Sequence, residues 1–164
     1  MPKMLAAGRR KLVFVPTLAD HHAPKVTELN AAGALDISCL VTLADFALGS
    51  TGNDDIDDPA LCSTSNSKSP GLSNYEAGMN FFRWDGADED KAWDLFTEAG
   101  VSGFLVQRIG KDYETPFAAA DEVQVYEVVT GDPQILNPDK GGYEKFKVGF
   151  YVQNKVDERA VVGA

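Results

Sequence analysis

The stretch that decides the fold runs from Ser73 to Ile109 and has three parts in succession. Residues 73–84 read SNYEAGMNFFRW, residues 91–96 read KAWDLF, and residues 101–109 read VSGFLVQRI. The first part alternates between two faces as a strand does, and the second has apolar residues at helical spacing. The third part is apolar on both faces, which is typical of a strand that is covered on both sides. The sequence therefore predicts a strand, a helix and a central strand in this order.

The first of these strands is amphipathic. Its two faces carry Tyr75, Ala77, Met79 and Phe81 on one side and Glu76, Gly78, Asn80 and Phe82 on the other. The first face is predicted to join the core and the second to be mostly in contact with water. Acidic residues from Asp85 to Asp90 precede the helix, where they complement its dipole, and Gly100 is predicted to end the helical segment.

Further strands are predicted on both sides of this block, at Lys11–Pro16, Leu35–Val41, Asp121–Val129 and Tyr143–Gln153. A short helical segment is predicted at 25–30, after Pro24. In the last strand Phe146, Val148, Phe150 and Val152 are predicted to point inward. Because strands outnumber helices, the predicted fold is mainly β: an antiparallel β-sandwich or partly closed barrel with one flanking α-helix.

The domain organisation is predicted as one β domain with two appended segments. The 164 residues suffice for a single core, placed at residues 11–153. A flexible basic N-terminal arm is expected at 1–10, and a C-terminal tail at 154–164 that is loose or pairs with a neighbour. Residues 48–72 are polar and rich in glycine, proline and aspartate, and are predicted to be a long irregular loop. Loops of this length are usually functional or disordered.

Composition limits the classes of function. The formal net charge is −10, which argues against a protein that grips nucleic acid, because phosphate binding needs clustered lysine and arginine. The acidity indicates either solubility or a surface that repels DNA, and charge alone leaves both open. No apolar run is long enough to cross a bilayer, and residues 1–11 have no signal-peptide core, so synthesis in a cytoplasm and no membrane partner are expected.

The sequence contains no recognisable catalytic or cofactor motif. There is no phosphate-binding glycine loop, nucleophile elbow or His-Glu-x-x-His, so no enzyme activity, catalytic residue or cofactor is predicted. His21 and His22 are expected to point to opposite sides of a surface loop. Cys39 and Cys62 lack metal-ligand spacing and are expected to be free buried thiols.

Three other groups of residues have competing interpretations. The aspartates Asp54, Asp55, Asp57 and Asp58 are the type of ligand that calcium takes, but the glycine and closing glutamate of an EF-hand loop are absent, so a solvated acidic loop without metal is predicted. Trp84 and Trp93 are read as core rather than as a ligand platform. Arg83 and Arg108 are read as surface ion pairs, with an acid of a neighbouring subunit as the alternative partner.

Several segments together resemble the major tail, or tail tube, proteins of siphophages, which have long non-contractile tails. The segments are Asp36–Cys39, Pro70–Glu76, Phe81–Arg83, Trp93–Phe96, Gly103–Lys111 and Phe117–Val123. The likeness spans roughly residues 11–153, and the order of the segments is more specific than any one of them. It implies hexameric rings that stack into a hollow tube in the virion tail, with a β-lined, acidic channel for DNA and the helix on the outside.

The resemblance also implies partners and site residues. The partners are further copies of the chain, a tape measure protein, a tail terminator and baseplate or tip proteins, while DNA passes through the channel without specific binding. The long loop with Asp54, Asp55, Asp57 and Asp58 is expected to bridge successive rings, together with the terminal arm. Glu76 and Asn80 are expected to face the channel, although Lys145 and Lys147 would hold DNA if they faced it too. The alternatives are a tail terminator, a head decoration protein, a small-ligand-binding β-barrel or a metal-dependent hydrolase.

Overall fold

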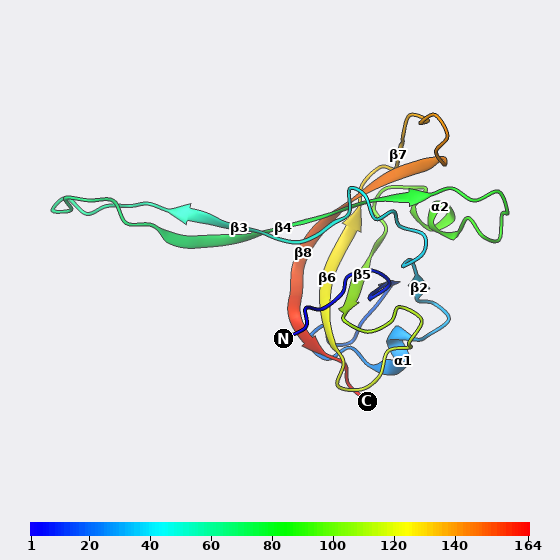
Figure 1. The fold of residues 1–164 in the computed structure, drawn as a ribbon. Coiled ribbons are helices and arrows are strands. Elements are labelled where there is room, and N and C mark those ends of the chain that lie inside the picture. Colours follow the sequence, from blue (N-terminus) through cyan, green and yellow to red (C-terminus); the bar gives the residue numbers. More distant parts are fainter.

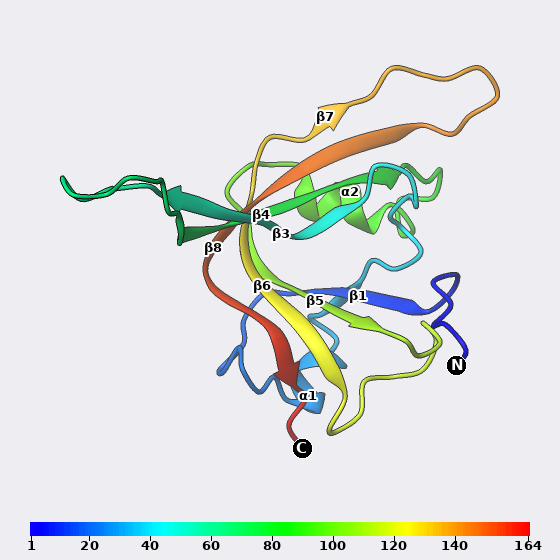
Figure 2. The ribbon, with the colours of Figure 1, turned by 60° about the vertical axis from the view of Figure 1, so that its left-hand side comes forward.

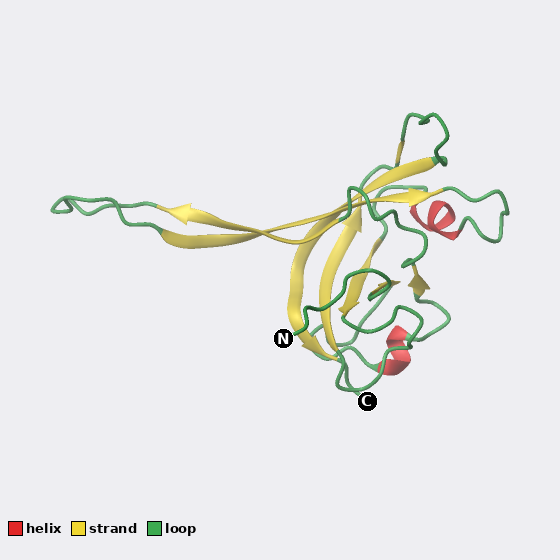
Figure 3. Cartoon of the chain, viewed as in Figure 1, coloured by secondary structure: helices red, strands yellow, loops and turns green.

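The computed structural model describes all residues from 1 to 164, in eight strands and two short helices. The strands are β1 (Arg10–Val15), β2 (Leu35–Asp36), β3 (Ala47–Ile56), β4 (Ser69–Phe82), β5 (Ser102–Ile109), β6 (Glu122–Thr130), β7 (Gln134–Ile135) and β8 (Lys145–Val161). The helices are α1 (Val26–Leu29) and α2 (Lys91–Phe96). All strands belong to one antiparallel sheet in the order β2-β1-β5-β6-β8-β4-β3, and β7 pairs with β8 outside this path (Figures 1 and 3).

The sheet is strongly bent and does not close into a barrel. Figure 2 shows β1, β5 and β6 in one half and β7, β4 and β3 in the other, with β8 passing through both. The pairing of β6 with β8 shifts register between Val123 and Val125 and again between Tyr126 and Val128. Such irregularities increase twist and bending. The prediction of a mainly β, antiparallel fold is confirmed, with the strands joined in one curved sheet.

The concave side of the sheet holds the larger hydrophobic cluster. It includes the predicted inward residues Met79 and Phe81 of β4 and Phe146 and Val148 of β8. Phe81 stacks on Phe146 with ring centroids 5.3 Å apart. The helix α2 closes this side with Ala92 and Phe96, both fully buried. The period-2 pattern therefore predicted the core face of both strands correctly.

A second cluster lies on the opposite face of β1, β5, β6 and the end of β8. It contains Val13, Val106 and Val125 and is covered by Leu29 of α1 and by Phe117. Because β5 contributes Leu105 to the first cluster and Phe104 and Val106 to the second, both of its faces are buried. This confirms the prediction of a central strand at Val101–Ile109.

The C-terminal residues differ from the expected tail. Residues 154–161 continue β8 and pair with β6, from Asp157 opposite Val125 to Val161 opposite Glu122. Ala160 and Val162 are buried in the second cluster. The prediction of a separate tail at 154–164 is wrong, because residues 154–161 extend β8 through pairing with β6.

Some predicted boundaries also move. Only Leu35 and Asp36 form β2, and Val41 instead makes an isolated bridge to Phe81. The helix α1 covers part of the expected segment 25–30, and α2 covers the expected segment 91–96. Gly100 follows α2 at φ 89°, in the left-handed conformation that favours glycine.

Candidate assembly surfaces

The most prominent surface feature is a long hairpin that leaves the body of the molecule (Figure 1). The strands β3 and β4 pair from Ala47 opposite Gly78 to Ile56 opposite Ser69, so the expected irregular loop at 48–72 is mostly a β-ribbon. We call residues 51–74 the arm. Every arm residue except Gly71 is exposed. The arm therefore gains stability from strand pairing but contributes nothing to either hydrophobic cluster.

The four aspartates of the predicted acidic loop all lie on the arm and are exposed. Asp54 accepts a hydrogen bond from the Asn74 amide at 2.8 Å, and Asp55 pairs with Lys68 at 3.5 Å. Asp57 and Asp58 follow β3 at the start of the tip. No group of three or more histidine, cysteine, aspartate or glutamate side chains is placed to hold a metal ion.

The apex of the arm is a tight turn. The Ser63 amide donates to the Ala60 carbonyl at 2.9 Å, and the Ala60 amide donates to the Ser63 hydroxyl at 3.1 Å. These bonds place Leu61 and Cys62 at the two central positions of the turn, where both are exposed. An exposed leucine at the outermost point of a polar hairpin is available for contact with another surface.

The convex face of β4 and its neighbours carries the residues predicted to line a channel. Glu76 is exposed on this face. Asn80 is on the same face but only 7% exposed. The Thr42 amide donates to the Asn80 carbonyl at 2.9 Å, so the segment with Thr42 runs beside β4. Lys147 stands directly opposite Asn80 on β8 and is exposed. The structure thus places Glu76 and a lysine on this face and leaves Asn80 largely covered.

One row of this face has almost no side chains. Ala47, Gly78 and Gly149 are directly paired across β3, β4 and β8. A Cβ atom added at Gly78 or at Gly149 would meet no atom within 4 Å. The convex face is therefore open and smooth at its centre.

The sheet ends at strands that have no partner on their outer side. The path ends at β3 on one edge and at the two-residue β2 on the other. The short strand β7 is a further edge beside β8. Unpaired strand edges offer backbone donors and acceptors to another chain.

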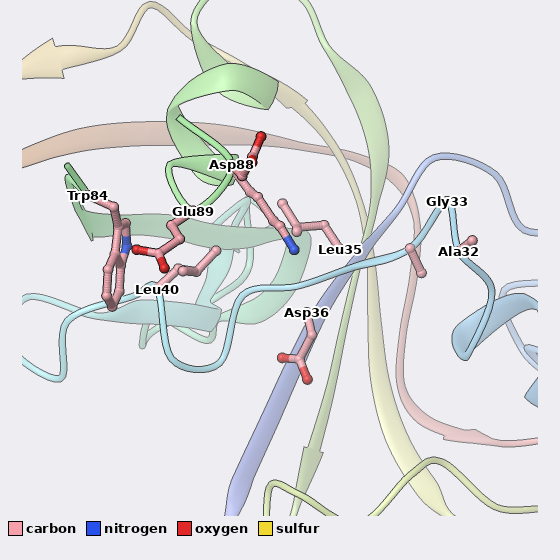
Figure 4. A pocket seen from close by; sticks show the side chains of 10 residues that line it. Ala32, Gly33, Leu35, Asp36, Leu40, Trp84, Asp88 and Glu89 are labelled. Atoms are coloured by element: carbon pink, nitrogen blue, oxygen red, sulfur yellow. The ribbon is translucent and has the colours of Figure 1, made fainter. Parts of the chain in front are cut away.

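Two depressions lie on either side of Trp84. The first, shown in Figure 4, has a volume of about 700 Å³ and combines Leu35, Leu40 and Trp84 with the acids Asp88 and Glu89. The second has a volume of about 800 Å³, and we call it the Tyr143 groove. Its lining includes Cys39, Phe82, Trp84, Ile135, Tyr143 and Lys145. Trp84 is 40% exposed, so the prediction that it is a core residue is wrong; Trp93 does pack against the first cluster.

Of the two arginines, Arg83 forms the predicted ion pair at the surface, whereas Arg108 does not. Arg83 is exposed and pairs with Asp90 at 2.9 Å while it lies over the Trp93 ring. Arg108 is buried and donates to Asp121 at 3.2 Å. It also donates to three loop carbonyls, those of Asp112, Thr115 and Pro116. The prediction of a surface pair at Arg108 is therefore wrong: this side chain organises the β5–β6 connection from inside.

The electrostatics of this buried site favour an ionised carboxylate at Asp121. Burial alone would raise the pKa of Asp121, but hydrogen bonds from Lys111, the Ala118 amide and Arg108 lower it below its ordinary value. Asp121 is thus held as an anion between two cations. No sequence motif indicated this site, since most of the acceptors around Arg108 are backbone carbonyls.

The segment with the two histidines lies beside the end of β8. His22 contacts Asp157 at 2.6 Å between Nδ1 and Oδ2, and the Val161 amide donates to the His22 carbonyl at 3.3 Å. The rings of His21 and His22 lie on the same side, with centroids 3.9 Å apart, so the expected opposite orientation is wrong. Burial would raise the pKa of Asp157, but the bonds from His22 and the Arg159 amide lower it. These contacts attach the segment with the two histidines to the end of β8.

The termini and cysteines complete the surface. Residues 1–9 are exposed and precede β1, and the Tyr113 amide donates to the Gly8 carbonyl at 3.0 Å. Cys39 and Cys62 are both free and exposed, which corrects the expectation of buried thiols. Neither helix is long and apolar enough to cross a membrane.

An open sheet with free edges, a smooth convex face and an arm without a core of its own are the features of a subunit that assembles with other protein chains. The chain belongs to the phage tail tube protein family, whose family model matches residues 1–164. It is thus a structural component of the virion tail.

A solved structure shares this fold. It is described as the cryo-EM structure of the anti-feeding prophage baseplate, 6-fold symmetrised, and one of its chains matches with a TM-score of 0.57 at 12% sequence identity. The match covers 94% of this chain and 95% of that chain. No curated protein sequence matches the chain.

Proposed function

We propose that this tail tube protein forms hexameric rings that stack into a hollow tube through which DNA passes during ejection. The observation that carries the proposal is the combination of an open sheet with an exposed arm that packs against nothing in its own subunit. Neighbouring copies would cover the free strand edges within a ring, and the arm would reach the next ring. The 6-fold symmetrisation of the similar baseplate structure supports the ring number.

In this arrangement the two faces of the sheet have different tasks. The convex face with Glu76 and Asn80 lines the passage, and its side-chain-poor row at Ala47, Gly78 and Gly149 leaves the bore unobstructed. The helix α2 closes the concave side and points outward. We infer from the chain's net charge of −10 that the passage is acidic, which would let DNA slide without adhering, even though Lys147 shares the face with Glu76.

The stacking of rings is heterologous, because the surface that carries the arm differs from the surface that receives it. Heterologous contacts that do not close produce open-ended polymers. Other components must therefore set the length of the tube and close its ends. We assign these tasks to a tape measure protein, a tail terminator and baseplate or tip proteins of a long non-contractile tail. The role is structural and not enzymatic.

Negative-stain electron microscopy of the concentrated, purified protein tests this proposal. Rings or tubes of uniform bore are the expected result. A protein that remains monomeric at high concentration and shows metal-dependent enzymatic turnover would overturn the proposal.

A further inference from the structure

We propose that the apex of the arm, at Leu61 and Cys62, seats in the Tyr143 groove of a second copy of the chain. This inference rests on the proposed tube, and it names the receptor site for the arm. Three properties of the chain lead to it: where the two surfaces lie, what apolar residues they carry and how their charges compare.

The arm and the groove lie at opposite ends of the same strand. The arm leaves the body at the N-terminal part of β4 (Figures 1 and 2). Phe82 and Trp84 line the groove where β4 ends. A 14-residue strand spans about 45 Å at the usual rise. The apex therefore cannot fold back into the groove of its own subunit, but a second copy placed along the direction of β4 brings the two together.

The apolar parts of the two surfaces are matched. The groove is bordered by the exposed side chains of Trp84, Ile135 and Tyr143. The apex offers Leu61, which is fully exposed at the centre of the turn. Burial of a leucine side chain against aromatic rings stabilises a contact because it removes apolar surface from water. Leu61 has no apolar partner within its own subunit.

An unpaired lysine in the groove also matches the acidic character of the arm. The arm carries four aspartates and one lysine, and only Asp55 has an ion-pair partner. The groove is lined by two bases, Arg83 and Lys145, and two acids, Asp85 and Glu144. Arg83 pairs with Asp90, whereas Lys145 makes no ion pair within the chain. An arm aspartate next to Lys145 would neutralise both groups and would favour the arm over an uncharged occupant.

The two cysteines of the chain provide a direct test, because Cys62 is at the apex and Cys39 lines the groove. Docking brings the two thiols of different copies together. Mild oxidation of the concentrated protein with diamide should join them, with the thiol hydrogens passing to diamide. The expected product on a non-reducing gel is a ladder of covalent dimers, trimers and longer species that dithiothreitol collapses.

Single variants distinguish this contact from contacts between like residues. Cys39→Ser alone and Cys62→Ser alone should each remain monomeric on the gel. A mixture of the two variants should give covalent dimers with one chain of each kind and nothing longer. A dimer in either single variant would reveal a contact between two apices or two grooves and would overturn the inference.

A matched pair of leucine variants tests the apolar contact. Leu61→Asp should reduce the yield of the ladder at least about tenfold, whereas Leu72→Asp, also exposed but on the shaft of the arm, should leave it unchanged. Equal yields from both variants would show that the apex does not dock. Tubes in the microscope without any covalent product overturn the groove assignment alone. The absence of both tubes and ladder overturns the proposed tube itself.

Discussion

The guanidinium of Arg108 and the carboxylate of Asp121 form an ion pair at 3.2 Å in which both side chains are almost completely removed from water, with 2% and 3% of their surfaces exposed. The same guanidinium donates to three carbonyls of the β5–β6 connection. Arg108 therefore acts as an internal brace for this connection.

Removal of one partner of this pair should destabilise the fold strongly. We expect Asp121→Asn to lower the free energy of unfolding by about 3–5 kcal/mol, because it leaves a buried guanidinium without its counter-charge. Lys111→Gln is the matched control, because Lys111 bonds to the same carboxylate but is 55% exposed, and it should cost below about 1 kcal/mol. Urea unfolding measures both values, and equal losses would contradict the role assigned to Arg108.

The depressed pKa of Asp121 predicts acid sensitivity. Its folded-state pKa is below its unfolded value of about 3.9, so its stabilising contribution is complete above that value and is lost as the pH falls through the folded pKa. The free energy of unfolding should therefore decline below about pH 4, and Asp36 and Asp157 shift in the same direction. The loss between about pH 5 and pH 3 should be smaller in Asp121→Asn. If Asp121→Asn lost as much stability in acid as the wild type does, Asp121 would be excluded as a source of the acid sensitivity.

Two glycines of the sheet, Gly103 in β5 and Gly78 in β4, should respond differently to replacement by alanine. A Cβ at Gly103 would lie 2.3 Å from the ring of Phe14, which is buried in the first cluster, so Gly103→Ala must displace a core aromatic ring. Overpacking of this kind costs about 1–3 kcal/mol. Gly78→Ala meets no atom and should leave thermal stability within about 0.5 kcal/mol of the wild type. Thermal unfolding followed by circular dichroism compares the two, and the prediction requires Gly103→Ala to be clearly the less stable.

Loss of the arm should separate folding from assembly. Because Ser50 pairs with Tyr75, residues 51–74 can be replaced by Asn-Gly, which forms a tight hairpin turn between these two residues. The shortened chain should unfold cooperatively with nearly unchanged stability, since the arm contributes to neither cluster. It should form no long tubes in the electron microscope. If the shortened chain formed long tubes, the arm would not be required for the contacts between rings.

The side of the sheet that faces the passage can be mapped by labelling. In assembled tubes of the Glu76→Cys variant, the new cysteine should react with a small maleimide. It should not react with a maleimide attached to a polymer that is too large to enter the bore. Asp94→Cys on α2, the proposed outer side, should react with both reagents. Peptide mass spectrometry reads the modification at each position. Equal reactivity of position 76 toward both reagents would place the convex face on the outside.

The sequence predicted the parts of the fold that depend on local periodicity. In β4 and β8 every second residue is apolar near the body, so the buried set that includes Met79, Phe81 and Phe146 was predicted correctly. The same argument identified β5 as central, since Phe104 and Leu105 both needed cover. Periodicity is informative here because one face of each strand is excluded from water.

The missed features depend on contacts between distant segments. The arm has no apolar alternation, so its β-structure follows from pairing between β3 and β4 and not from local preference. Arg108 was placed on the surface because the carbonyls that surround it belong to a loop whose path the sequence does not specify. The alternation predicts Asn80 to be wet, but its side chain is buried in the folded chain.

The continuity of β8 has a mechanical consequence. This 17-residue strand supplies Phe146 to one hydrophobic cluster and Ala160 to the other, and it is bonded to β4 at one end and β6 at the other. No hinge separates the two halves. Tension applied to the arm enters the body through β4 and is shared at once by both halves, so a subunit under load should rupture in one step and should not lengthen gradually.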